Sequence, residues 1–278
     1  MDKLSVVITC YKPGEKLAEA FASLRAQTDN DFEIIIVNDA SPSEDLNQAC
    51  RQLETDEAVG VIWRRKNGGA AAARNDGCRA IAGNIYIPLD ADDVLPPDAV
   101  ATIRHTFDEW PAADFVFGDY LYRPDGGAEK VMNAGAMCGS DGWLRPQSLA
   151  KRFGIYGGSP FRKIAWERVS GYDESVPSGH EDVDFWLRMV NSGARGRYVN
   201  HLLYIWQRSE RGMGSLVPKA KKMRIKWVKN APFYDRYAHP IGWRKKVIRE
   251  ALKESDYGLA VRLFFGLILS KLKLREKV

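Results

Sequence analysis

Cysteine is scarce in this chain, and its spacing excludes a small domain that is held together by disulfides or by zinc. Only 4 of the 278 residues are cysteines, and none lies in a CxxC pair or at the spacing of a zinc site. A disulfide framework or a zinc ribbon would need such a pattern. No secretory signal pattern precedes the first apolar run, so we expect Cys10, Cys50, Cys78 and Cys138 to be reduced thiols in the cytoplasm.

Long apolar runs and two common nucleotide-binding signatures are missing as well. No stretch reaches the ~20 apolar residues that cross a bilayer, so we expect no membrane-spanning helix. The Walker loop and the GxGxxG fingerprint are absent, which argues against a P-loop NTPase and a dinucleotide-binding domain. No internal repeat is visible. The chain is nevertheless 45% hydrophobic, which is enough for a well-packed core.

Short apolar runs alternate with helical patterns through the first half of the chain. Runs that are typical of buried strands cover residues 4–9, 32–37 and 59–63, and a fourth begins at residue 85. Strands that are separated by helices pair in parallel. The sequence therefore predicts an α/β fold with a doubly wound, mainly parallel sheet that is flanked by helices.

Three carboxylates follow the fourth run within four positions. Asp90, Asp92 and Asp93 precede Pro96 and Pro97, and such crowding is costly unless a cation or hydrogen-bond donors offset it. Ligands of open α/β sheets bind at this end of the strands. Because side chains alternate along an extended chain, we expect Asp90 and Asp92 to point the same way and to suit one hard divalent ion. The alternative is that these aspartates cap the helix that starts near Pro96.

Two further polar groups follow neighbouring strands. Asp39 comes after the second run, and Asn67 begins a glycine-rich turn after the third. Gly68 and Gly69 offer backbone amides at the start of a helix, with Arg74 one turn inside. This arrangement suits a diphosphate, although an ion pair is the alternative for the arginine.

A second acidic pair opens a later helical pattern. Glu181 and Asp182 fall in the first turn of a helix whose apolar residues share one face. Acidic residues there are favoured by the helix dipole, so simple N-terminal stabilisation is the alternative to a chemical role. The apolar face consists of Val183, Trp186, Leu187 and Val190.

Taken together, these motifs resemble those of family 2 glycosyltransferases, which have the GT-A fold and are inverting, nucleotide-sugar-dependent enzymes. The resemblance covers roughly residues 4–208. Five motifs in the family's order are more specific than any one of them. They are SVVITCY from residue 5, VNDAS from residue 37, NGG with ARNDG from residue 67, LDADD from residue 89 and GHEDVDFWLR from residue 179.

The resemblance implies a role for each candidate residue on the donor side. The donor would be a nucleotide sugar, with a UDP-sugar as the first expectation. Its pocket would be bordered by Thr9 and Tyr11, at the end of the first strand and just after it. A carboxylate would accept a hydrogen bond from the base ring, and others would contact ribose, sugar or diphosphate. Asp92 would be the metal ligand for Mg²⁺ or Mn²⁺. The pocket residues are Thr9 and Tyr11, the base contact is Asp39, and the remaining contacts are Asn67, Arg74 and Asp90.

The resemblance also implies the catalytic residues. Asp182 would be the general base that takes the proton of an acceptor hydroxyl, and Glu181 would orient it or contact the acceptor. Glycosyl transfer develops negative charge on the leaving nucleotide, which the metal and Arg74 would stabilise. One carboxylate suffices as the base of a single displacement. His180 is better suited to gating or acceptor contact than to the role of base.

Two departures from the family pattern concern the contact to the nucleotide base and the metal site. Asn38 stands where the first aspartate of the base-binding turn is usual, which removes a charge. Many relatives carry a histidine after the final core strand, whereas this chain has Gln207 and Arg208 there, with His201 at the wrong place. We therefore expect the metal to rest on Asp92, phosphate and water.

We expect three segments along the chain. Residues 1–210 form the GT-A domain, with a nucleotide-sugar-binding half at 1–118 and an acceptor-binding half at 119–210. Residues 211–278 form a basic, amphipathic helical extension, which we call the C-terminal extension. It can lie on an anionic membrane surface or pack on the domain. The interpretation is a cytoplasmic protein, peripheral on the inner face of the cytoplasmic membrane, without a nucleic-acid partner.

The expected function is transfer of a sugar to a glycan or lipid-linked acceptor in cell-surface polysaccharide synthesis. The acceptor pocket would be built from the glycine-rich loops of residues 126–158. Trp143, Tyr156, Phe161 and Trp186 are the candidates for stacking on the acceptor.

Two other functions stay open. A sugar nucleotidyltransferase would also use aspartates and a metal, but it usually needs a glycine- and lysine-rich N-terminal phosphate loop, and residues 10–14 are a poor one. A non-catalytic nucleotide-sugar-binding module would not need both acidic motifs.

Overall fold

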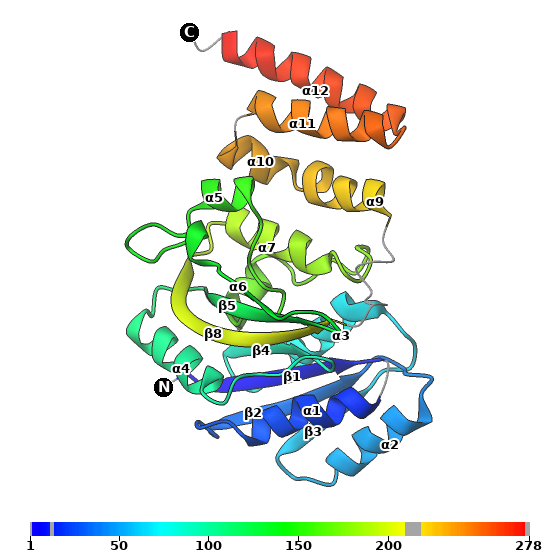
Figure 1. The fold of residues 1–278 in the computed structure, drawn as a ribbon, viewed down its shortest axis with the longest axis vertical. Helices are drawn as coiled ribbons and strands as arrows, with labels where there is room; N and C mark the ends of the chain where they lie inside the picture. The colour runs from blue at the N-terminus through cyan, green and yellow to red at the C-terminus, as the bar shows by residue number, and fades with distance from the viewer. Residues whose placement is uncertain (1, 12–13, 209–217, 239, 276–278) are drawn as a thin grey trace.

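The protein is described by a computed structural model, which covers residues 2–11, 14–208, 218–238 and 240–275. One sheet with helices on both faces occupies most of the molecule, and the helices of the C-terminal extension rise in tiers from one helical layer (Figure 1). No described helix is both long enough and apolar enough to cross a membrane.

The first half of the sheet is parallel, as predicted. The four strands lie in the order β3-β2-β1-β4. The chain thus runs from β1 through β2 to β3 at the edge, and β4 then pairs with the other side of β1. Helices cover both faces, which is why β1 is a nearly continuous buried run. The strands are β1 (Leu4–Cys10), β2 (Phe32–Asn38), β3 (Val59–Trp63) and β4 (Ile85–Asp90).

The second half of the sheet contains antiparallel pairs. β7 lies between β4 and β5 and is antiparallel to both, whereas β8 runs parallel to β5 along its whole length. The predicted boundary at residue 118 therefore falls inside a strand that both halves share. The additional strands are β5 (Phe115–Pro124), β6 (Lys130–Met132), β7 (Phe161–Arg162) and β8 (Gly196–Arg208).

Alternation along β1 divides the core into two layers. Val6 and Ile8 face the helices α1, α2 and α4, while Val7 faces α3 and α7. α3 approaches β1 closely at Gly77, where a Cβ atom would lie 2.4 Å from a methyl carbon of Val7. The helices are α1 (Gly14–Arg25), α2 (Glu44–Leu53), α3 (Gly69–Ala80), α4 (Ala99–Glu109), α6 (Lys163–Arg168) and α7 (Glu181–Asn191).

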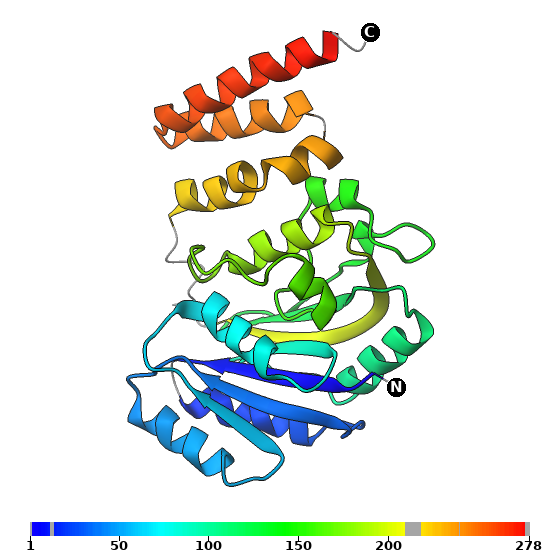
Figure 2. The same cartoon turned by 180° about the vertical axis from the view of Figure 1, so that it is seen from behind.

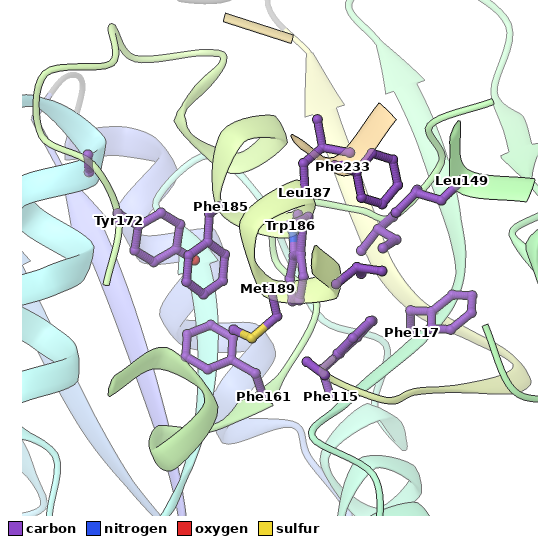
Figure 3. Packing of buried hydrophobic residues seen from close by; sticks show 14 of the residues in the cluster. Phe115, Phe117, Leu149, Phe161, Tyr172, Phe185, Trp186, Leu187, Met189 and Phe233 are labelled. Carbon is purple, nitrogen blue, oxygen red and sulfur yellow. The ribbon is translucent and has the colours of Figure 1, made fainter. Parts of the chain in front are cut away.

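Aromatic rings fill the layer between β5, β7 and α7. Figure 3 shows Phe161 and Trp186 among these rings, and both side chains are 0% exposed. Trp143 packs edge-on against Trp110, and the guanidinium of Arg195 lies 4.1 Å from the centre of the Trp143 ring. The prediction that Trp143, Phe161 and Trp186 stack on the acceptor is therefore wrong. Phe161 and Trp186 are part of the interior, and Trp143 packs on Trp110.

The predicted loop-rich segment of residues 126–158 has more order than expected. It contains β6 and two short helices, and the segment ends beside the sheet edge that carries the aspartates. The short helices are the 3₁₀ helix η1 (Gly135–Met137) and α5 (Pro146–Lys151).

The C-terminal extension is helical, as predicted, and it is anchored on α7. Asp184 is 0% exposed and accepts hydrogen bonds from Lys229 Nζ (2.6 Å) and Asn230 Nδ2 (3.0 Å), while Arg188 pairs with its other oxygen. α12 is the outermost helix in both views (Figures 1 and 2). The helices are α9 (Lys219–Met223), the π-helix η2 (Arg224–Lys229), α10 (Ala231–Tyr237), α11 (Pro240–Lys253) and α12 (Tyr257–Arg275).

Candidate active site

The three aspartates meet in a turn at the end of β4. The strand ends at Asp90, and the amide of Asp93 donates to the carbonyl of Asp90 (2.9 Å). One carboxylate oxygen from each of Asp90, Asp92 and Asp93 lies within 4.8 Å of the others. The turn, rather than alternation along an extended strand, brings them together. The capping alternative is wrong, because α4 begins after Asp98 and none of the three is its N-cap.

Each of these carboxylates has a different environment. Asp93 is 2% exposed and accepts hydrogen bonds from the Tyr156 hydroxyl and from the Gln207 amide (2.9 Å). Burial, with Asp90 and Asp92 adding repulsion, raises the pKa of Asp93 well above its usual range. Burial and then the charge of Asp90 raise the pKa of Asp92 to about 6.

This donor set fits a hard divalent cation. Carboxylate oxygens are the ligands that Mg²⁺ and Mn²⁺ prefer, and a dication would offset the burial and the mutual repulsion that raise these pKa values. No described side chain donates a hydrogen bond to Asp92, so its oxygens are the ones left to a ligand. The geometry agrees with the predicted metal role of Asp92.

Arg74 lies at the centre of the site. It is 4% exposed, and its Nη2 atom donates to both oxygens of Asp90 (2.7 and 2.9 Å), while Nη1 donates to Glu181 Oε1 (2.6 Å). Burial opposes its charge, but the carboxylates of Asp90 and Glu181 raise the pKa of Arg74 well above its usual value. Here the ion-pair alternative describes the residue, because both terminal nitrogens already bind carboxylates.

The two acidic residues at the start of α7 have different partners, and within the described chain Asp182 accepts a hydrogen bond only at Oδ1, from the Val183 amide (2.7 Å). Glu181 is 3% exposed, and its second oxygen accepts hydrogen bonds from the amides of Gly179 and His180. A residue so fully bonded orients the helix and is not available to an acceptor. Asp182 faces Gly157, where a Cβ atom would lie 3.0 Å from Asp182 Oδ2.

The electrostatics of Asp182 suit a general base. Burial, with Glu181 adding repulsion, raises the pKa of Asp182 to about 6. A base is most effective when its pKa lies near the working pH, since it is then ionised and still holds a proton well. Gly157 packs close to Oδ2, where the Cβ atom of any other residue would crowd the carboxylate.

Asp39 organises the loop before α3. Its carboxylate accepts hydrogen bonds from Asn67 Nδ2 (3.0 Å), from the amides of Gly68 (2.9 Å) and Gly69 (2.8 Å), and from Arg64. The two glycine amides are therefore bonded to Asp39 and are not free for a diphosphate in this structure. Sequence reasoning missed Arg64, although its place directly after β3 was a signal.

The remaining donor-side candidates lie at the same sheet edge. Thr9 is paired with Asp90 in the register of β1 and β4, and its hydroxyl donates to Asp90 Oδ1 (3.1 Å). Tyr11 follows the end of β1. Asn38 donates its side-chain amide to Asn47 Oδ1 on α2 (2.9 Å). The expected convergence of the three strand ends is confirmed.

Among the described residues, no histidine forms a hydrogen bond or an ion pair with the carboxylates of the turn. His201 pairs with Asp98 (2.9 Å). Gln207, at the position where relatives carry a histidine, donates its side-chain amide to Glu19 (3.1 Å) and only its backbone amide to the aspartate turn. Burial lowers the pKa of His180, which precedes α7.

These features define a class of protein: a doubly wound α/β domain with a carboxylate cluster at its strand ends and a second acidic pair at the start of a helix. The model of the family "Glycosyl transferase family 2" matches residues 5–164, and that of "Glycosyl transferase family group 2" matches residues 85–272. The first match covers more than half of the chain, so the chain belongs to glycosyl transferase family 2.

Curated relatives carry the same family name. The uncharacterized glycosyltransferase YibD of Escherichia coli K12 is 27% identical over 219 residues, which are 73% of this chain and 60% of YibD. The uncharacterized glycosyltransferase YwdF of Bacillus subtilis is 28% identical over 191 residues, 67% of each protein. The chain thus spans less than two thirds of YibD's length.

Solved structures confirm the predicted GT-A fold. Staphylococcus aureus TarS in complex with UDP-GlcNAc has a TM-score of 0.67 at 15% identity, over 89% of this chain and 71% of that one. The mannosyltransferase PcManGT from Pyrobaculum calidifontis, in complex with GDP-Man and Mn²⁺, has a TM-score of 0.65 at 18% identity, over 97% of this chain and 80% of that one.

The pKa of Asp182 leads to a prediction about pH. Because a base must be ionised to accept a proton, we expect kcat/KM to rise with pH through about 6 and then to level off. Asp182→Asn should lower turnover by about 100-fold to 10,000-fold, measured as release of nucleoside diphosphate from the donor. Asp108→Asn, on the exposed surface of α4, is the matched control. Wild-type turnover in Asp182→Asn would contradict the assignment.

Proposed function

We propose that this chain is a metal-dependent, inverting glycosyltransferase that moves a sugar from a UDP-sugar onto a hydroxyl of a glycan or lipid-linked acceptor in cell-surface polysaccharide synthesis. The observation that supports it most strongly is that Arg74 forms two ion pairs, one with Asp90 and one with Glu181. They hold Asp90, at the donor end of β4, against the helix that begins with Glu181 and Asp182. The donor and the general base Asp182 would therefore lie on either side of the buried Arg74 guanidinium.

Asp92 is the residue that we assign to Mg²⁺ or Mn²⁺. The bound ion would supply Lewis-acid stabilisation of the negative charge on the leaving diphosphate. The Mn²⁺ bound in the mannosyltransferase PcManGT complex supports this choice. Asp93 already accepts hydrogen bonds from the Tyr156 hydroxyl and the Gln207 amide, so we assign it to shaping the turn.

Asp182 performs the proton transfer in the proposed reaction. It takes the proton of the acceptor hydroxyl as that oxygen forms a bond to the anomeric carbon and the bond from this carbon to the diphosphate oxygen breaks. With one free carboxylate at the site, the displacement takes place in a single step, and the configuration at the anomeric carbon inverts. Glu181 positions Asp182 by fixing the first turn of α7.

On the donor side we assign Thr9, Tyr11 and Asp90 to the wall of the nucleotide-sugar pocket. Asp39 accepts four donors from its own neighbourhood, which fills the lone pairs of a carboxylate. We therefore give it the role of holding Asn67 and the glycine turn beside the pocket. The family match favours this transfer over nucleotidyl transfer.

The donor can be identified by ligand-dependent unfolding. UDP, GDP, dTDP and CDP are each tested with and without Mn²⁺, and we expect UDP to stabilise the protein only with the metal. A ligand at 100 times its dissociation constant adds ~2.7 kcal/mol to the free energy of unfolding. Asp92→Asn should abolish the effect and Asp108→Asn should keep it. Stabilisation by GDP instead would change the donor class, and stabilisation by no nucleotide would contradict the proposal.

We further propose that the C-terminal extension contacts the inner face of the cytoplasmic membrane through α12. Apolar side chains at helical spacing line one exposed face of this helix, and Lys and Arg outnumber Asp and Glu about three to one after residue 218. An anionic bilayer complements both properties. The exposed residues are Tyr257 (65%), Val261 (55%), Phe264 (53%), Phe265 (63%) and Ile268 (40%).

Flotation with vesicles tests this contact. We expect the protein to float with phosphatidylglycerol vesicles and not with phosphatidylcholine vesicles, and to be released by salt, because surface charge interactions are screened. Phe264→Ser with Phe265→Ser should prevent flotation, whereas Val131→Ser, at a residue that is 57% exposed on β6, should not. Equal flotation of both variants would contradict the proposed face.

A further inference from the structure

Four aromatic side chains gather beside the candidate active site, and we call them the aromatic platform: Tyr120, Tyr122, Tyr156 and Trp206. The ring centres of Tyr120 and Tyr156 lie 5.0 Å apart, as do those of Tyr122 and Trp206. Trp206 also lies 6.4 Å from both Tyr120 and Tyr156. All four residues are only partly buried. They form one continuous aromatic surface.

The platform lies where β5 and β8 extend beyond the core. Phe115 to Gly118 are buried in β5, whereas every later residue of the strand is partly exposed. Tyr122 pairs with Trp206 in the register, and Tyr120, two residues earlier, falls on the same face. The rings therefore cover a stretch of sheet that no helix of the described chain buries completely.

The platform is connected to both halves of the reaction site. The Tyr156 hydroxyl donates to Asp93 of the aspartate turn, and the next residue, Gly157, faces Asp182. Burial raises the pKa of Tyr120, and the charge of Asp182 adds to that rise, so this phenol lies within electrostatic reach of the base. A molecule on the platform would be adjacent to the carboxylate that accepts its proton.

We propose that the aromatic platform is the acceptor subsite and that it binds the pyranose ring of a glycan. This inference rests on the proposed function and names its acceptor class. The apolar C–H face of a pyranose packs on an aromatic ring. The hydroxyl-bearing side chains of Ser and Thr, and a simple lipid alcohol, have no such ring face.

Ligand-observed NMR with methyl β-glucoside, methyl β-galactoside and chitobiose tests the subsite in the presence of UDP and Mn²⁺. We expect at least one sugar to bind the wild type, and Trp206→Ala to weaken that binding by about tenfold or more. Trp206→Phe, which keeps a ring, should retain most of it, and Tyr122→Ala should weaken it as well. Trp63→Ala, at a residue that is 39% exposed on the opposite edge strand, is the control.

The donor measurement separates this inference from the proposed function. Trp206→Ala should keep the stabilisation by nucleotide and Mn²⁺, because the platform lies outside the donor residues. If nucleotide binding persists and no pyranose binds, or if Trp206→Ala and Tyr122→Ala bind sugars like the wild type, the subsite is wrong and the transferase proposal stands. If no nucleotide binds while sugar binding depends on Trp206, the platform is a sugar-binding surface but not an acceptor subsite, and the transferase proposal falls.

Discussion

The buried guanidinium of Arg74 is the interaction on which the site depends. A charge inside a protein is tolerated only when it is paired and hydrogen-bonded, and here the partners are Asp90 and Glu181. The three residues come from α3, β4 and α7. Arg74 and Glu181 are both buried, so α3 and α7 cannot separate without leaving a buried charge unpaired. The donor end of the sheet is tied to them through Asp90, whose side chain is 40% exposed.

The helix of the base is fixed at a second point as well. Glu181 holds the start of α7, and Asp184, one turn later, holds Lys229 and Asn230 at the base of the C-terminal extension. Asp182 lies between these two anchors. The extension is therefore part of the structure that positions the base, and a membrane contact through α12 would orient the site relative to a lipid-linked acceptor.

Much of the sheet and the placement of the candidate residues could be predicted, because carboxyl ends of parallel strands meet at one edge and the motifs follow those strands. The partners of each residue could not. Arg74 and Glu181 are 107 positions apart, and nothing local marks Asp39 as the ligand of the glycine amides. The aromatic platform depends on the pairing of β5 with β8, which the sequence does not reveal. Loop aromatics such as Trp143 therefore looked equally suitable.

Urea unfolding of Arg74→Met tests the central claim most directly. Arg79→Met is the matched control, because Arg79 lies on the same helix but its ion pair with Asp76 is exposed. The account predicts a loss of about 3–5 kcal/mol in the free energy of unfolding for Arg74→Met, since two carboxylates lose their cation. It predicts a loss below about 1 kcal/mol for Arg79→Met. Equal, small losses in both variants would contradict it.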